Sequence, residues 1–180
     1  RAKEAFSFLQ NWEYLVENED DTIVKFSGPL GRINVYHGRS SYEVGVEFGP
    51  ENRNQSKMFS LGQLIKLTSG GEAKEYLNPC ATSEESVHRF LREQAELLKK
   101  HGERIFRGDL SVWSDLEETR KKNAFNMEIK SKLENARSLA DKAFKARRFS
   151  EVVQYLSEVE PWLTPTEKKK LSYARDHLEA

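Results

Sequence analysis

The sequence contains one cysteine, four histidines and no net charge, and each of these scarcities argues against a class of function. A single thiol, Cys80, cannot form an internal disulfide, so a disulfide scaffold is excluded. With 29 Lys and Arg against 29 Asp and Glu, the chain has no overall field that would gather phosphates or anionic lipid. No apolar run approaches the roughly 20 residues that a membrane span requires. We therefore expect a cytoplasmic protein that binds no membrane.

Motifs for nucleophilic catalysis, phosphate binding and metal binding are also missing. The sequence has no Gly-x-Ser-x-Gly elbow, no glycine-rich phosphate loop, and no His-x-x-x-His or Cys-x-x-Cys pair. The four histidines are far apart, and Cys80 follows Pro79 without a histidine nearby. We therefore predict no metal and no cofactor, and we favour a non-catalytic protein over an enzyme.

Glycine is distributed unevenly, which divides the 180 residues near Pro79. Eight of the ten glycines lie in residues 1–80, and residues 81–180 are richer in charged side chains. Strand patterns interrupted by glycine, followed by charged segments with helical periodicity, are typical of an α+β protein. We predict a sheet domain with flanking helices over residues 1–80, and a helical region over 81–180 that can pack on the first as one unit.

The first part predicts a helix followed by an antiparallel meander of three or four strands. Apolar side chains between Ala5 and Trp12 have the spacing of a short amphipathic helix. Residues 28–31, Gly-Pro-Leu-Gly, suit the tight turn of a hairpin. Alternation of apolar and polar residues predicts strands at 21–26, 32–37 and 42–48, then a short fourth strand at Met58 and Phe59 and a helix over 60–67.

The second part predicts a bundle of about four helices. Thr82 to Glu85 fit a capping box at the start of the first, and Gly102 is a stop signal. Thr164 to Glu167 combine a cap, a proline at the first helical position and a capping-box glutamate. A second helical pattern covers 115–147 and carries an apolar stripe from Phe125 to Phe144. A third helix is expected to be capped by Ser150 and ended by Pro161. The last helix is expected to bury Leu171, Ala174 and Leu178.

One polar grouping has a geometric basis, because it falls on neighbouring predicted strands. The group consists of His37, Arg39, Glu43 and Glu47. Adjacent antiparallel strands could place an imidazole, a cation and two carboxylates within reach on one sheet face, as an acid–base pair with a phosphate-binding arginine. The alternative is that these residues are ordinary solvent-facing positions opposite the core face of the sheet, and we favour that alternative.

An acidic run, which includes Glu19, Asp20 and Asp21, precedes the first predicted strand. The run lacks the ligand spacing of a calcium loop, so we predict a solvated turn that could also contact a basic partner. The basic clusters are short and interleaved with acidic residues, which makes nucleic-acid binding an unfavoured alternative.

Residues 136–161 resemble a single tetratricopeptide-type helical hairpin. The small residues Ala140 and Ala143, the aromatic Phe144 and the closing Pro161 fall where that repeat places them. Because a solenoid needs about three or more such units, the resemblance implies helical-hairpin packing and no peptide-binding groove.

The first half looks similar to small uncharacterised bacterial proteins of the immunity type. The similarity lies in short apolar motifs such as Phe6-Ser-Phe-Leu-Gln and Tyr42-Glu-Val-Gly-Val-Glu-Phe. It implies a protein that neutralises a toxin by binding it and does no chemistry.

We therefore predict a non-catalytic protein-interaction module, either toxin-neutralising or regulatory, whose partner is another protein. The exposed sheet face and the acidic turn are the expected contact sites. Two alternatives stay open: a small enzyme or phosphate-ligand binder that uses the His37 group, and an RNA-binding accessory protein.

Overall fold

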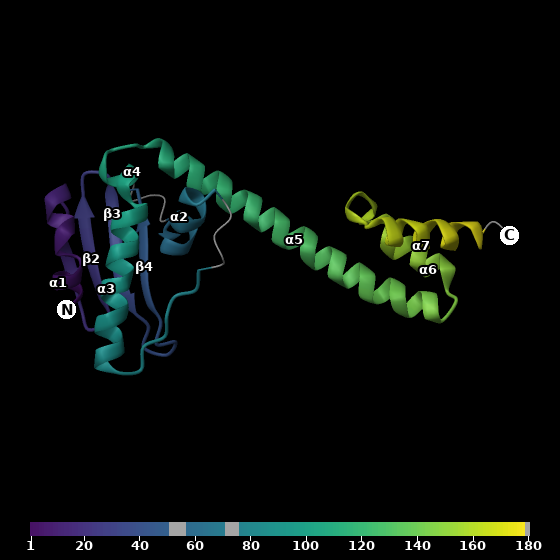
Figure 1. The fold of residues 1–180 in the computed structure, drawn as a ribbon, viewed down its shortest axis with the longest axis horizontal. Coiled ribbons are helices and arrows are strands. Elements are labelled where there is room, and N and C mark those ends of the chain that lie inside the picture. Colours follow the sequence, from purple (N-terminus) through teal and green to yellow (C-terminus); the bar gives the residue numbers. More distant parts are fainter. Residues whose placement is uncertain (51–56, 71–75, 179–180) are drawn as a thin grey trace. The chain divides into compact units, whose positions relative to one another are not determined.

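The computed structural model describes residues 1–50, 57–70 and 76–178 (Figure 1). The chain divides into two compact units, residues 1–120 and residues 121–180. Its elements in chain order are α1 (Ala2–Ala5), the 3-10 helix η1 (Ser7–Trp12), β1 (Leu15–Glu19), β2 (Ile23–Gly28), β3 (Gly31–His37), β4 (Val44–Gly49), β5 (Phe59–Ser60), α2 (Leu61–Thr68), α3 (Glu84–His101), α4 (Glu103–Phe106), α5 (Ser111–Lys145), α6 (Phe149–Ser157), the 3-10 helix η2 (Glu160–Trp162) and α7 (Pro165–Asp176). No helix in the described part of the chain has the length and apolar character needed to cross a membrane.

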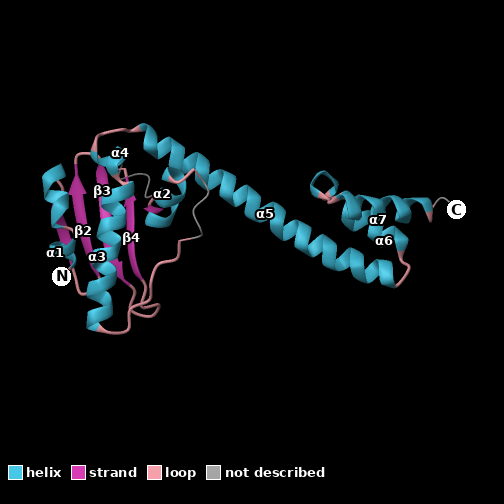
Figure 2. Cartoon of the chain, viewed as in Figure 1, coloured by secondary structure: helices cyan, strands magenta, loops and turns pink. Residues whose placement is uncertain are grey.

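The first unit is built on an antiparallel meander whose strands are adjacent in the order β1-β2-β3-β4-β5. The three central strands, β2, β3 and β4, lie side by side in Figure 2. The predicted α+β fold class is confirmed, and the sheet has five strands where three or four were expected. The additional strand is β1. All five of its residues are exposed, so it lacks the alternation of buried and exposed positions that identifies a strand in a sequence.

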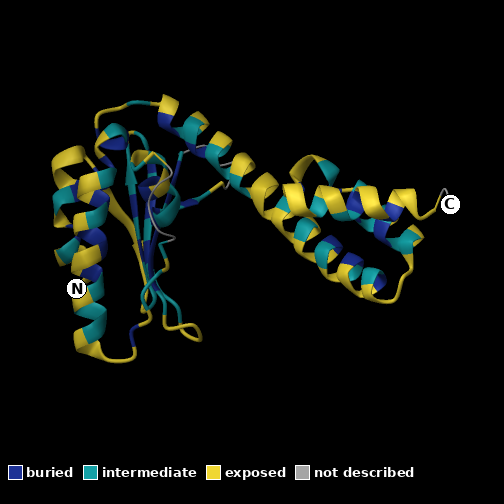
Figure 3. Cartoon of the chain, turned by 45° about the vertical axis from the view of Figure 1, so that its right-hand side comes forward, coloured by how far each residue is buried: buried dark blue, intermediate teal, exposed yellow. Residues whose placement is uncertain are grey.

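One face of the sheet carries the core of the first unit. Val24, Val35 and Val46 are cross-strand neighbours, and Phe26, Ile33 and Phe48 form a second such row. Cross-strand partners project from the same face, and all six are buried. Helix α3 is buried on one side and exposed on the other (Figure 3). The residues that cover the two rows include Phe6, Leu9, Leu61, Leu64, Leu91, Leu98, Val112 and Leu116.

The helices after residue 81 belong to this core up to the start of α5. Leu91 and Leu98 of α3, with Val112 and Leu116 of α5, lie in the same buried cluster as the strands. The division of the chain therefore falls after residue 120, and the predicted division at residue 80 separates parts that share one core. The physical reason is that a sheet with one apolar face must bury it against helices, and α1 and α2 are too short to do so alone.

The second unit has a separate core formed by the end of α5 with α6 and α7. Its buried residues are Ala136, Ala140, Ala143, Val152, Leu156, Val159, Leu163, Leu171 and Ala174. Three expectations for this region are wrong. Phe125, expected in the apolar stripe, is 55% exposed, and Leu178, expected to be buried, is 51% exposed. Ser150, expected to cap the helix, lies inside α6, whose N-cap residue is Arg148 and makes no side-chain capping hydrogen bond. The resemblance of this region to a tetratricopeptide hairpin stays a prediction.

Two capping boxes mark helix starts that the sequence signalled. The box at α7 is the predicted one, with Thr164 accepting from the backbone N–H of Glu167 and the Glu167 side chain accepting from the backbone of Thr164. The box at α3 begins one residue later than predicted, because Ser83 caps the helix and Ser86 completes the exchange. A serine hydroxyl both donates and accepts, so Ser86 can take the place that Glu85 was expected to fill.

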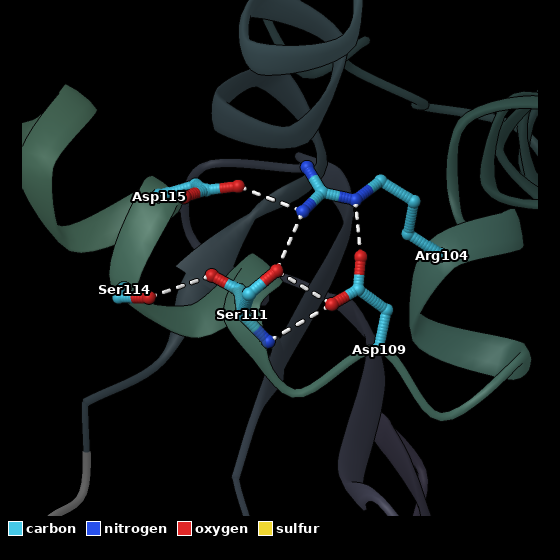
Figure 4. A network of polar contacts seen from close by, with 5 residues as sticks. All are labelled: Arg104, Asp109, Ser111, Ser114 and Asp115. Carbon is cyan, nitrogen blue, oxygen red and sulfur yellow. Dashed lines mark hydrogen bonds and ion pairs between the residues drawn. The ribbon is translucent and has the colours of Figure 1, made fainter.

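A single arginine ties the turn between α4 and α5 together (Figure 4). Arg104 Nε donates to Asp109 Oδ2 over 2.7 Å, while Nη2 donates to Asp115 Oδ2 over 2.7 Å and to Ser111 Oγ over 2.9 Å. The backbone N–H and the hydroxyl of Ser111 both donate to Asp109 Oδ1. These bonds use the Arg104 and Asp109 charges within the fold, so the cluster is structural.

Acid is expected to weaken the second unit through one carboxylate. Hydrogen bonds from Arg137 lower the pKa of Glu167 to about 2 from an ordinary value of 4.5, and those from Thr164 act in the same direction. The folded state therefore holds the proton less tightly than the unfolded state, so the stabilisation is present above pH 4.5 and is lost as the pH falls towards 2. We expect Glu167→Gln to cost about 1–2 kcal/mol at neutral pH and to flatten this acid dependence, as urea unfolding at a series of pH values would measure. Equal acid sensitivity in both proteins would contradict this role.

Candidate functional site

The second face of the sheet is the candidate site, and we call it the open face. Its rows are given by the cross-strand pairs Leu15–Ser27–Arg32, Asn18–Lys25–Asn34–Glu47 and Ile23–Tyr36–Gly45. Within the described ranges, the helices of the first unit contribute their apolar side chains to the core on the opposite face. Most open-face side chains are half-buried, and Leu15 at the edge of this face is 71% exposed. The open face is thus a continuous surface of polar and apolar groups.

Tyr36 of β3 lies on this face beside the carboxylates of Glu43 and Glu47. Its ring lies over Gly45, where a Cβ atom would collide with the ring, so glycine is required for this close approach. Asn78 Nδ2 donates to Tyr36 Oη over 3.1 Å. Burial raises the pKa of Tyr36, and the charges of Glu47 and Glu43 add to the shift. The phenol therefore stays protonated and keeps a hydroxyl proton to donate.

Charges of opposite sign occupy different strands of the open face. Lys25 of β2 and Arg32 of β3 supply the cations, while Glu47 of β4 and Glu43, just before it, lie close enough to Tyr36 to affect its pKa. The Nε atom of Arg32 is buried without a hydrogen-bond partner among the described residues. The open face therefore presents a basic half on β2 and β3 and an acidic half on β4.

The structure does not bring the predicted His37 group together. His37 pairs with Val44, a core residue, so its side chain is on the covered face, where Nε2 lies 3.0 Å from the carbonyl oxygen of Ala81. Glu47 pairs with Asn34 and projects from the other face. The imidazole and this carboxylate are thus on opposite sides of the sheet, and the acid–base pair expected between them lacks its geometry.

Arg39 and Glu43, the other two members of that group, lie in separate surroundings. Arg39 is exposed in the turn after β3, and its charge helps to lower the pKa of Asp20. Glu43 forms an isolated bridge with Cys80 and lies near Tyr36. Sequence reasoning missed Tyr36 itself, because nothing in the sequence sets which strand positions face each other across β3 and β4.

The acidic turn is held together by hydrogen bonds to the side chain of Asp20. Asp20 Oδ1 accepts hydrogen bonds from the N–H and hydroxyl of Thr22 and from the N–H of Ile23, and the bonds from Thr22 are the main reason that the pKa of Asp20 is lowered. Glu19 forms an ion pair with Lys3 at 2.5 Å, and Asp21 is exposed. Asp20 therefore shapes the β1–β2 turn, while Asp21 remains available to solvent.

A hydroxyl–imidazole pair that the sequence did not signal lies between α2 and α3. Thr68 Oγ1 is 2.6 Å from His101 Nδ1, and burial lowers the pKa of His101. The same hydroxyl also lies 3.0 Å from the carbonyl oxygen of Leu64 and 3.2 Å from that of Ile65, both in the last turn of α2. These contacts join the last turn of α2 to the end of α3.

Metal binding is not indicated where the chain is described. No group of three or more His, Cys, Asp or Glu side chains in residues 1–50, 57–70 and 76–178 is arranged to hold a metal ion. Comparisons with protein-family models, curated proteins and solved structures found no significant match. Function is therefore inferred from the surface geometry alone.

Proposed function

We propose that the chain is a non-catalytic protein-interaction module whose partner binds the open face of the sheet. The observation that carries the proposal is the one-sided packing of the sheet, in which the helices cover one face and leave a polar and aromatic face on the other. A face built on paired strands is rigid, so it can be bound without a large ordering cost.

The composition of the open face supports a protein partner. Tyrosine and arginine are enriched at energetically important interface positions, and Tyr36 and Arg32 lie on this face. Cations on β2 and β3 with carboxylates around β4 favour a partner that presents an acidic patch beside a basic one. A nucleic acid would gain from Lys25 and Arg32 but would be repelled by Glu43 and Glu47, so RNA binding is the less favoured alternative.

The specific form that we favour is neutralisation of a toxin or regulation of an enzyme by covering its active surface. A role of this kind needs shape and charge complementarity and no catalytic group on the binding module. This fits the separation of His37 from Glu47 by the sheet. A toxin gene beside the gene for this chain would support the toxin-neutralising form.

Charge reversal on the open face is expected to weaken partner binding strongly. We propose to recover the partner with the tagged chain from a nuclease-treated native lysate, and then to measure its affinity for Lys25→Glu. Reversing a cation opposite an acidic patch should weaken binding at least about tenfold, because like charges then meet at the interface.

Two control variants test whether the loss of affinity is specific to the open face. Lys66→Glu makes the same charge change on the exposed surface of α2 and should leave the affinity unchanged. His37→Gln alters the covered face and should also bind normally. Equal affinity of Lys25→Glu and the native chain would contradict the proposal. A partner that is recovered only when nuclease is omitted, and whose binding falls steeply with salt, would favour the RNA alternative.

A further inference from the structure

Strand β1 lies at the edge of the sheet, and its outer edge has no strand partner within the described residues. It pairs only with β2, and every one of its side chains is exposed. Leu15 and Val16 are 71% and 41% exposed, which is unusual for adjacent apolar residues of a strand. Such an edge presents backbone donors and acceptors that another extended chain can use.

The two faces of β1 continue the two faces of the sheet. Leu15 pairs with Ser27 on the open face, whereas Val16 pairs with Phe26 on the covered face. The register shifts between Val16 and Asn18, so Glu17 occupies a bulge. Side chains of an added strand would therefore meet Leu15 on one side and Val16 on the other.

Charge decides what can add to this edge. Glu17 and Glu19 lie on β1, Asp20 and Asp21 follow directly, and β1 carries no basic residue. Lys3 forms an ion pair with Glu19, so Glu17 is the carboxylate of β1 that sets the charge preference. In an antiparallel pair of two copies centred on the strand, Glu17 would face Glu17, and like charges directly opposite are destabilising. A second copy of this chain is therefore disfavoured by repulsion, whereas a basic strand would be attracted.

We propose that the partner supplies an extended segment, with Lys or Arg alternating with apolar residues, that adds to the outer edge of β1 as a further strand. This inference rests on the proposed protein-binding function and names the chemistry of the partner next to the open face. Main-chain hydrogen bonds supply the pairing, and the apolar side chains of the segment pack on Leu15 or on Val16, whichever lies on their face of the sheet. Glu17 selects the basic sequence.

Synthetic peptides with the chemistry of this segment test strand addition directly. The probe is a short peptide in which Lys alternates with Val, added to the full chain and followed by amide hydrogen exchange. The expected result is slower exchange at residues 15–19 and saturable binding. Two matched peptides serve as controls: one has Glu in place of Lys, and the other keeps the charge but has Pro at central positions, where it cannot donate to a strand ladder.

A variant of the chain separates strand addition from general charge attraction. Glu17→Gln should weaken binding of the Lys–Val peptide by about two- to fivefold, whereas Glu118→Gln, an exposed carboxylate on α5, should leave it unchanged. The proposal is overturned if the proline-containing peptide binds as well as the Lys–Val peptide, or if exchange at residues 15–19 does not slow.

The outcomes also distinguish this proposal from the proposed function. If Lys25→Glu loses the recovered partner while the Lys–Val peptide leaves residues 15–19 unprotected, the open face is the binding site and strand addition is wrong. If the peptide protects residues 15–19 but the recovered partner binds Lys25→Glu normally, strand addition stands and the open face is not the contact.

Discussion

Replacing Leu156 by alanine is expected to lower the free energy of unfolding of the second unit by about 2–5 kcal/mol. Leu156 is 1% exposed and lies in the buried cluster that joins the end of α5 to α6 and α7. The alanine would leave a cavity among side chains that already include several small alanines, so little repacking is available. Urea unfolding followed by circular dichroism would measure the loss.

Leu178→Ala is the matched control, because it makes the same chemical change at a position that is 51% exposed. Its effect should stay within about 0.5 kcal/mol. The two hydrophobic clusters share no residue, so Leu156→Ala should leave the unfolding of residues 1–120 unchanged. Equal effects of the two leucine variants, or one common transition shifted by Leu156→Ala, would contradict the existence of a separate second core.

Replacing Gly31 by alanine is expected to destabilise the first unit by about 2–5 kcal/mol. Gly31 begins β3 with a φ of 144°, a conformation that residues with a side chain rarely adopt. A Cβ atom there would also collide with the backbone oxygen of Gly49 at the end of β4. The substitution therefore strains the β2–β3 turn and pushes against β4, which carries part of the open face.

Gly108→Ala separates these two costs. Gly108 also has a positive φ, of 85°, but no atom lies within 4 Å of the position of an added Cβ. Its replacement should cost only the conformational penalty of about 1–2 kcal/mol. If thermal unfolding shows the same loss for both variants, the close approach of Gly31 to β4 contributes nothing to stability.

Most helices and four of the five strands could be predicted from local patterns. The capping box at Thr164 needs only neighbouring residues, and the alternation within β4 reflects a strand whose large apolar side chains, Val44, Val46 and Phe48, lie on one face. β1 could not be predicted in this way, because none of its residues is buried. The boundary after residue 120 also escaped prediction, because composition reports the change from strand to helix and does not report which helices cover the sheet.

The candidate site was harder to predict than the fold, because it depends on strand register. The predicted group required His37 and Glu47 on one face, but His37 pairs with Val44 and Glu47 with Asn34. Tyr42 has a positive φ of 55°, so regular alternation does not extend back from β4 through the turn. A shift of one residue moves a side chain to the other face of a sheet, and sequence periodicity alone does not determine such a shift between strands.

The most direct test of the central claim is to locate the bound partner on the isotopically labelled chain by cross-saturation nuclear magnetic resonance. If the partner binds the open face, signals of Lys25, Asn34 and Tyr36 should lose intensity, while those of the exposed side of α3, such as Arg89 and Glu96, should not. Loss of intensity confined to α3 or to residues 121–178, with the open face unaffected, would contradict the claim.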